Sequence, residues 1–502
     1  MPVLIFYKVV YVKMLQADEM DGKTCFGMEN IMSKVSVNVK ENIAFLNSHI
    51  GIKNSYDIVS REITIGGRNA CMYLIDGFCK DEMMQKFLQF LMELKAEDMP
   101  KDISGMTQQF MPYVEVDVQS DFDQVIYFIL AGTFALFIEG FDQCILIDAR
   151  TYPARSVEEP EKDKALRGSK DGFVETIVCN TALIRRRIRS TELCMELLNA
   201  GESSKTDIVI CYMQGRADEK LLETVKKKIQ NIQIDALSMN QETLAECLYK
   251  KPWFNPYPKF KYTERPDTAA AHILEGNIVI LVDNSPSAMI IPTSLFDLLE
   301  EADDFYFPPI TGTYLRLTRI LITMITYLLT PTFLLLMMRP EWIPETFAFI
   351  QLKDPVNLPI LWQFLLLELA IDGLRLAAVN TPNMLSTPLS VLAALVLGEF
   401  AVNSGWFAGE IMLYMAFVAI ANYTQSNYEL GYAIKFQRIL TLILTAVFGG
   451  WGYLAGVIIC VSCLIFNKTL GGKGYLYPLL PFDWKQLKKR MIRHRKSPDI
   501  QR

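Results

Sequence analysis

The chain has 502 residues and a mass of 57.2 kDa, which is too long for one ordinary domain and predicts two or three folded units. Hydrophobic residues make up 51% and charged residues 21%, which excludes disordered, collagen-like and disulfide-scaffold classes. The net charge of −6 argues against broad nucleic-acid binding, so no nucleic-acid partner is expected. The three histidines lie far apart, which does not favour a histidine-rich metal site or a catalytic triad.

Residues 1–40 are interpreted as an N-terminal extension. The chain opens on MPVLIFYKVVYVK, which is apolar but lacks the basic beginning and the cleavage site of a signal peptide. We therefore expect no export signal and a cytoplasmic N-terminal region. Met14, Met20 or Met28 could be the true start.

Residues 41–312 mix charged and apolar residues as a soluble protein does, and they predict a two-lobed α/β domain. Residues 151–172 are charged and contain two prolines and two glycines, so we expect them to link a first subdomain, 41–150, to a second, 173–312. No internal repeat is evident. Strand-like runs cover residues 57–65, 70–75, 133–138, 144–148, 207–213 and 277–282.

Two charged motifs stand out in the second subdomain. Arg185, Arg186, Arg187 and Arg189 form a basic run, interpreted as a solvated helix face that docks an acidic neighbour. A phosphate or nucleic-acid site is disfavoured because no aromatic residues interleave with the arginines. Residues 263–267, TERPD, place two acids and one arginine in a proline turn and predict a local ion-pair corner.

The C-terminal third, residues 313–482, is predicted to form an all-α polytopic membrane domain. Residues 320–338 run for 19 positions without a charge, enough for a helix to cross about 30 Å of hydrocarbon. Residues 439–466 run for 28 positions without a charge. Between them lie three interrupted apolar stretches, residues 360–379, 388–401 and 411–423.

The charges that flank these stretches suggest a topology. Arg316 and Arg319 precede the first span, and the tail, residues 483–502, is strongly basic. The positive-inside rule places both flanks in the cytoplasm, which requires an even number of crossings. A final hairpin that turns near residues 449–452 would satisfy this, and one tilted helix with an external tail is the alternative.

The second apolar stretch, ILWQFLLLELAIDGLRLAAV, carries an intramembrane charged triad. Glu368, Asp372 and Arg375 are spaced four and three residues apart, so they share one helical face. Because ionisable groups at membrane depth are costly, they are expected to face protein or water. The triad is interpreted as an interhelical lock, since its mixed signs can neutralise one another, and the lining of an ion or solute path is the alternative.

The third apolar stretch, STPLSVLAALVLGEFAVNSG, has Glu399 as its lone carboxylate. In a symmetric oligomer, one glutamate per subunit would form a negative ring, and such rings favour cations. Glu399 is therefore the pore-lining candidate. The alternative is that it pairs with another helix or lies at the membrane interface.

Residues 421–438, ANYTQSNYELGYAIKFQR, are polar and lie between apolar stretches. They predict a plain loop, with a re-entrant piece as the alternative. No catalytic residue, metal site or cofactor is expected. Residues 471–474, GGKG, lack the spacing of a phosphate loop, and neither a nucleophile elbow nor a metalloprotease histidine pair is present.

Several long blocks in series carry a resemblance to a known family. They are GFVETIVCNTALIRRRIRSTEL, GESSKTDIVICYMQGRADEKLLETVKKKIQNIQIDAL, TERPD and LEGNIVILVDNSPSAMIIP. In order and spacing, over roughly residues 40–482, the chain resembles the A subunits of the GerA family of spore germination proteins. Within the family, ELAIDGLRLAAVNTP is more similar to the sporulation-protein members than to nutrient-receptor subunits.

The resemblance implies a cytoplasmic α/β domain and a membrane domain in the spore inner membrane. It also implies a pentamer that forms a gated cation channel, amplifies germination by ion release, and acts with a small membrane partner and other germination proteins. By position, the family's pore-lining helix corresponds to residues 388–402, which include Glu399. Two other functions stay open: release of an anionic spore solute such as dipicolinate, and a non-conducting assembly scaffold.

Overall fold

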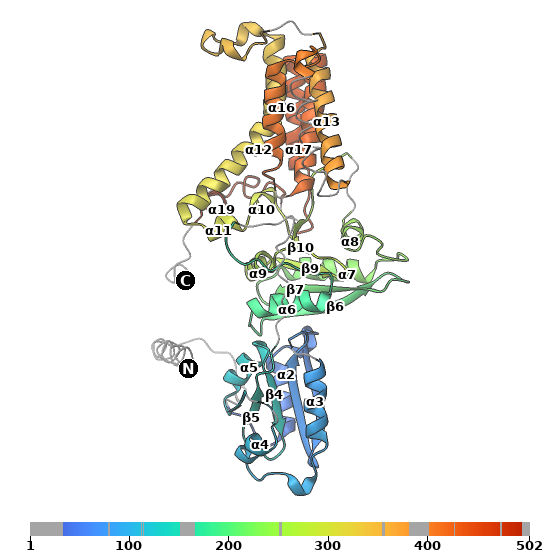
Figure 1. Ribbon diagram of the computed structural model, residues 1–502, viewed down its shortest axis with the longest axis vertical. Coiled ribbons are helices and arrows are strands. Elements are labelled where there is room, and N and C mark those ends of the chain that lie inside the picture. Colours follow the sequence, from blue (N-terminus) through green and yellow to red (C-terminus); the bar gives the residue numbers. More distant parts are fainter. Residues whose placement is uncertain are drawn as a thin grey trace.

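The computed structural model describes residues 34–493, apart from 79–80, 112, 114, 151–165, 250–253, 354–356, 381–400, 426 and 472–473. Figure 1 shows three bodies stacked along the long axis: a first α/β lobe, a second α/β lobe and a helical region at the far end. We call the first two lobe one and lobe two. The expected order, an α/β part followed by a helical part, is confirmed.

Lobe one is an antiparallel sheet with helices on both faces. The strand order is β1-β2-β4-β5-β3, and the apolar faces of the strands pack on α2 and α5 on one side and on α3 and α4 on the other. Residues 34–40 belong to this lobe, because Val35 and Val39 are buried in its core. The strands are β1 (Ile58–Ile65), β2 (Arg68–Ile75), β3 (Val116–Gln119), β4 (Phe134–Ile138) and β5 (Cys144–Ile147). The helices are α2 (Val39–His49), α3 (Asp81–Met92), α4 (Ile103–Gln109) and α5 (Phe122–Leu130).

Lobe two has the same construction, with the strand order β6-β7-β9-β10-β8. Helices α7 and α8 cover one face of its sheet, and α6 and α9 cover the other. The strands are β6 (Leu193–Ala200), β7 (Thr206–Met213), β8 (Lys261–Thr263), β9 (Ile278–Val282) and β10 (Ala288–Ile291). The helices are α6 (Ile177–Arg187), α7 (Glu219–Gln230), α8 (Gln241–Leu248) and α9 (Pro266–Leu274).

The two lobes are a structural repeat, which corrects the expectation of no repeat. Helices α2 and α6 both have 11 residues, α5 and α9 both have 9, and the paired strands β4 and β9 both have 5. A buried asparagine holds the chain in the same way in each lobe. Asn42 bonds both backbone groups of Ser36, and Asn180 bonds both backbone groups of Val174. The repeat is held by backbone and core geometry, which different apolar residues can satisfy.

A buried ion pair joins the lobes. The guanidinium of Arg185, on α6, donates to both carboxylate oxygens of Asp57 at 2.7 and 3.0 Å. Arg185 is completely buried, so the prediction of a solvated face is wrong at this residue, although the acidic neighbour is present. The TERPD ion-pair corner is confirmed, because Arg265 donates to both oxygens of Asp267 at 3.1 and 2.7 Å.

The helical region is built on α12, α13, α16, α17 and α18 (Figure 1). In the described part of the chain, α12 and α17 are long and apolar enough to cross a membrane, and α16 and α18 are shorter apolar helices. Their bounds are α12 (Pro309–Met338), α13 (Ile360–Asn380), α16 (Gly409–Asn422), α17 (Tyr428–Phe448) and α18 (Gly450–Ile465). Three short helices flank them: α10 (Leu295–Leu299), α11 (Asp303–Tyr306) and α19 (Trp484–Met491).

Helices α17 and α18 form the hairpin expected near residues 449–452. Gly449 makes the turn with a φ of +59°, a conformation that side chains rarely adopt. Beyond the turn, glycines let the helices touch. A Cβ at Gly452 would lie 1.8 Å from the carbonyl oxygen of Leu444, and one at Gly456 would lie 2.7 Å from the Thr441 side chain.

Candidate functional site

A cluster of buried charges lies among the apolar helices. Glu368 of α13 is almost fully buried, and its Oε1 accepts a hydrogen bond from Nε of Arg438, on α17, at 2.9 Å. Nζ of Lys435 lies 3.3 Å from the other oxygen of Glu368 and also donates to Asp372. Arg438 donates a further bond of 3.0 Å to the backbone oxygen of Thr326. The cluster therefore ties α12, α13 and α17 together.

Among the described residues, Arg375 forms no ion pair with Glu368 or Asp372, although all three line the same small cavity. Its guanidinium carbon lies 5.1 Å from the ring centre of Tyr423 and 5.5 Å from that of Tyr432. The expected neutralisation within one helix is therefore corrected, because Glu368 and Asp372 take their counter-ions from α17. The aromatic faces stabilise the arginine cation.

The cluster encloses little free space. The cavity beside it has a volume of about 10 Å³, near the least that holds one water molecule. The ion pairs to Lys435 and Arg438 neutralise Glu368 and Asp372. Glu399 and residues 388–400 lie outside the described residues.

The sequence prediction missed Lys435 and Arg438 as members of the site. Residues 421–438 were expected to form a loop, but α16 ends at Asn422 and α17 begins at Tyr428, so the loop prediction is wrong at residues 421–422 and from 428 on. Polar residues occur in this helix because one of its faces meets the acids of α13. Lys435 and Arg438 are spaced three residues apart, the helical spacing that could have matched them with Glu368 and Asp372.

A second ionic network joins lobe two to the helical region. Asp304 is completely buried and accepts hydrogen bonds from Arg316 at 3.3 Å and Arg319 at 3.2 Å, both on α12. Glu300 pairs with Arg316 at 3.1 Å, and Glu301 pairs with Arg319 at 3.0 Å. The start of α12 is thus fixed by charge to the segment that follows lobe two.

The network continues into α10 and α19. Arg490 of α19 lies 2.6 Å from the carboxylate of Asp297. Burial alone would raise the pKa of Asp297, but Arg490 and the Ser294 side chain hold it below its ordinary value. Nearby, burial and the Lys261 cation lower the pKa of His272 to about 4. His272 is therefore neutral at physiological pH.

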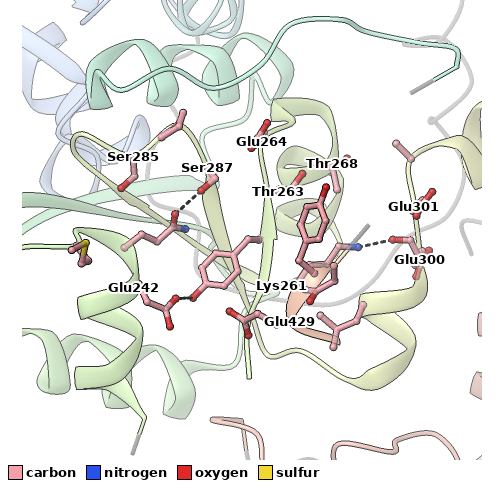
Figure 2. Close-up of a pocket in the computed structure, with 18 residues that line it drawn as sticks. Glu242, Lys261, Thr263, Glu264, Thr268, Ser285, Ser287, Glu300, Glu301 and Glu429 are labelled. Atoms are coloured by element: carbon pink, nitrogen blue, oxygen red, sulfur yellow. Dashed lines mark hydrogen bonds between the residues drawn. The ribbon is translucent and has the colours of Figure 1, made fainter. Parts of the chain in front are cut away.

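A pocket of about 450 Å³ opens at the same junction (Figure 2). Tyr262 donates to Glu242 at 3.1 Å, Ser287 donates to Gln241 at 2.6 Å, and Lys261 donates to the backbone oxygen of Glu300 at 2.8 Å. The pocket is lined by residues of β8, the start of α8, the turn before β10, the segment after α10 and the start of α17.

The lining of this pocket contains more acids than bases, although Glu300 and Glu301 are already paired with Arg316 and Arg319. Its labelled acids are Glu242, Glu264, Glu300, Glu301 and Glu429. Across the described ranges, no group of three histidine, cysteine or acidic side chains is arranged to hold a metal ion. Since the pocket touches both the sheet of lobe two and α17, a bound ligand would contact both.

Comparison with known proteins places the chain among spore germination proteins. The family model described as Bacillus/Clostridium GerA spore germination protein matches residues 46–502. Stage V sporulation protein AF of Bacillus subtilis (strain 168) is 36% identical over 92% of this chain and 93% of the relative. Spore germination protein KA of the same organism is 27% identical over 91% of this chain and 85% of that relative. The resemblance seen in the sequence blocks is confirmed.

The matches also include a solved structure. It is the crystal structure of the N-terminal domain of the A subunit of the Bacillus megaterium spore germinant receptor GerK3. It is 27% identical, covers 52% of this chain and 96% of that chain, and has a TM-score of 0.40.

Proposed function

Since this chain belongs to the GerA family of spore germination proteins, we propose that it is a membrane-embedded subunit of an oligomeric cation channel that amplifies germination by ion release. The proposed location is the inner membrane of the spore, with both lobes in the cytoplasm. The proposed partners are the lipid bilayer, further copies of the chain in a pentamer, a small membrane protein and other germination proteins.

The buried cluster of Glu368, Asp372, Lys435 and Arg438 is the observation that supports the membrane-embedded part of this proposal. Ionisable groups among apolar helices are costly and mark functional or bundle-holding positions in membrane proteins. Here they are paired between α13 and α17, so they hold the bundle together rather than conduct. In this proposal, conduction takes place where several copies meet, at a ring of Glu399 side chains.

Conductance of the reconstituted full chain tests the channel. Liposomes containing the wild-type protein are expected to pass monovalent cations, and Glu399→Gln is expected to lower cation selectivity because it removes the negative ring. Glu341→Gln is the matched control, since Glu341 is 67% exposed at its side chain and lies outside the apolar helices. Equal currents and selectivity in wild type and Glu399→Gln would remove Glu399 from the pore.

Release of an anionic solute such as dipicolinate is the second candidate. It requires cations that face a path. Lys435 and Arg438 are already paired with acids, which leaves Arg375, packed against Tyr423 and Tyr432, as the cation of this cluster that could serve. Solute flux without ion current would favour this function. Complex formation without any transport in liposomes would favour a non-conducting scaffold.

A further inference from the structure

A surface at the C-terminal end of the described chain combines exposed apolar and basic side chains. Phe482 and Trp484 are 67% and 65% exposed, and Leu479 and Leu480 just before them are 40% and 48% exposed. Exposed lysines follow on α19, at positions 485, 488 and 489. Among the described residues, no acid forms an ion pair with Lys485, Lys488 or Lys489, so their charge is available to a partner.

The opposite face of α19 is fixed to the molecule. Leu487 is buried, and Arg490 lies 2.6 Å from Asp297 and 2.8 Å from Glu300. The backbone N–H of Arg493 donates to the side chain of Thr313 at 3.1 Å. Successive residues of a helix are rotated by about 100°, so Lys485 and Lys489 lie opposite Leu487 and Lys488 lies to one side. Trp484, at the first position of the helix, lies nearer to Leu487 but is still 65% exposed.

The position of α19 along α12 matches the edge of a bilayer. Helix α12 has 30 residues and so a length of about 45 Å, against about 30 Å for the hydrocarbon of a membrane. Part of it must therefore lie outside the hydrocarbon. The end beside α19 carries the ionic network of Arg316, Arg319 and Asp304, which belongs in a polar layer (Figure 1).

We propose that residues 479–489 form a docking surface for anionic phospholipid, with Leu479, Leu480, Phe482 and Trp484 in the interfacial layer and Lys485, Lys488 and Lys489 on lipid phosphates. Exposed aromatic and aliphatic side chains next to lysines are typical of segments that lie in a membrane interface. The lysine charge selects anionic lipids over zwitterionic lipids. The inference rests on the proposed membrane location.

Arg490 lies on the opposite side of the same helix, so α19 connects the exposed surface to the ionic network at the junction. A lipid bound to α19 would therefore lie on the other side of the helix from Asp297 and Glu300, the acids that Arg490 contacts.

Hydrogen exchange of the full chain in lipid nanodiscs tests this surface. Backbone amides of residues 479–491 are expected to exchange at least about tenfold more slowly in discs with 30% phosphatidylglycerol than in phosphatidylcholine discs, since each lysine near the surface contributes about a fivefold preference. The triple variant K485Q/K488Q/K489Q should lose the difference, and K485R/K488R/K489R should retain it. A salt concentration of about 1 M should also reduce it.

The matched control is K86Q/K95Q/K101Q, which removes the same charge from exposed positions of lobe one and should behave as wild type. Equal exchange in both lipids, or a lipid difference that survives K485Q/K488Q/K489Q, would overturn the inference. Equal protection by soluble polyglutamate would show an acidic protein partner and would also overturn it. A protein that inserts into discs but shows no lipid preference overturns this inference alone, whereas failure to insert overturns the proposed membrane function as well.

Discussion

Lobe one and lobe two follow the same chain path but have different neighbours. Each has five antiparallel strands in one order, with a buried asparagine at the start of its first helix. Lobe two supplies hydrogen bonds to the helical region: Asn255 donates to the backbone oxygen of Cys463 at 3.1 Å, and the Tyr257 hydroxyl lies 3.2 Å from the sulfur of Cys460. Lobe one is held to lobe two through Asp57 and Arg185.

The difference shows how a repeated fold acquires two roles. The core positions are satisfied in both lobes by different apolar residues, so the architecture is preserved. Ion pairs occur where the segment after lobe two meets α12 and α19. We therefore expect changes at this junction to affect the helical region, and changes between the lobes to leave it intact.

The largest effect is expected at Asp304. Replacing Asp304 with Asn leaves Arg316 and Arg319 buried with weaker partners, and we expect a loss of about 4 kcal/mol. Thermal unfolding of the full chain in detergent, with hydrogen exchange at the start of α12, measures it. Asp123→Asn, on the exposed face of α5 in lobe one, is the control. An unchanged melting temperature in Asp304→Asn would show that the junction is not held by charge.

A smaller effect is expected between the lobes. Arg185→Met leaves Asp57 buried without its cation and should cost about 3 kcal/mol, while exchange in α12 and α17 stays as in wild type. Arg186→Met, on the exposed face of the same helix, should have little effect. A double-mutant cycle with Asp57→Asn measures the coupling. Faster exchange in the helices of Arg185→Met would contradict the separation of roles.

The two lobes should also differ in their response to acid. His272 is the seventh residue of α9, and Phe128 holds the same position in α5. The pKa of His272 is about 4 in the folded protein, below its ordinary value of about 6.5, because of burial and then Lys261. The stability from neutral His272 is complete above pH 6.5 and declines as the pH falls toward 4, by at most about 3 kcal/mol.

His272→Phe gives lobe two the residue of lobe one and should remove this decline between pH 6.5 and 4. The charged groups that act on His272 are Lys261, Asp297, Glu300 and Arg490, which all stay in the variant. Melting curves at stepped pH measure the effect, with His49→Gln as the control in α2. A decline of the same size in His272→Phe would assign the acid sensitivity to other groups.

The smallest effects should be equal in the two lobes. Asn42→Ala and Asn180→Ala each remove a side chain that donates and accepts one backbone hydrogen bond, and each should cost about 2 kcal/mol. Local hydrogen exchange in α2 and α6 would measure the losses separately. Very different losses of stability in the two variants would show that the lobes share a fold but that the two asparagines do not contribute equally to stability.

The sequence predicted the elements whose signal is local. All six strand-like runs are strands, and the buried face of α7 follows its helical spacing. Strands β3, β6, β8 and β10 were not predicted, because short or mixed runs gain their strand structure from neighbours in the sheet. The repeat was missed for a related reason, since it lies in the order of the strands and not in matching residues.

The candidate site shows the same limit. Glu368 and Asp372 could be singled out because charges inside an apolar run are conspicuous. Lys435 and Arg438 lie in a polar stretch that resembles a loop, and the contact with α13 is what makes it a helix with a buried charged face. Likewise, the sequence alone predicts Arg185 to be a surface arginine, because its partner Asp57 belongs to the other lobe.

The glycine contacts between α17 and α18 limit how this protein can move. Because Gly452 and Gly456 leave no space for a methyl group, sliding or rotating α18 against α17 would bring bulkier residues into this backbone contact, and we expect the pair to move together. Lys435 and Arg438 therefore cannot change their depth unless α18 travels with them. We therefore expect the hairpin of α17 and α18 to move as one rigid unit against α12 and α13 when the bundle opens. That movement would have to break the ion pairs of Lys435 and Arg438 with Glu368 and Asp372.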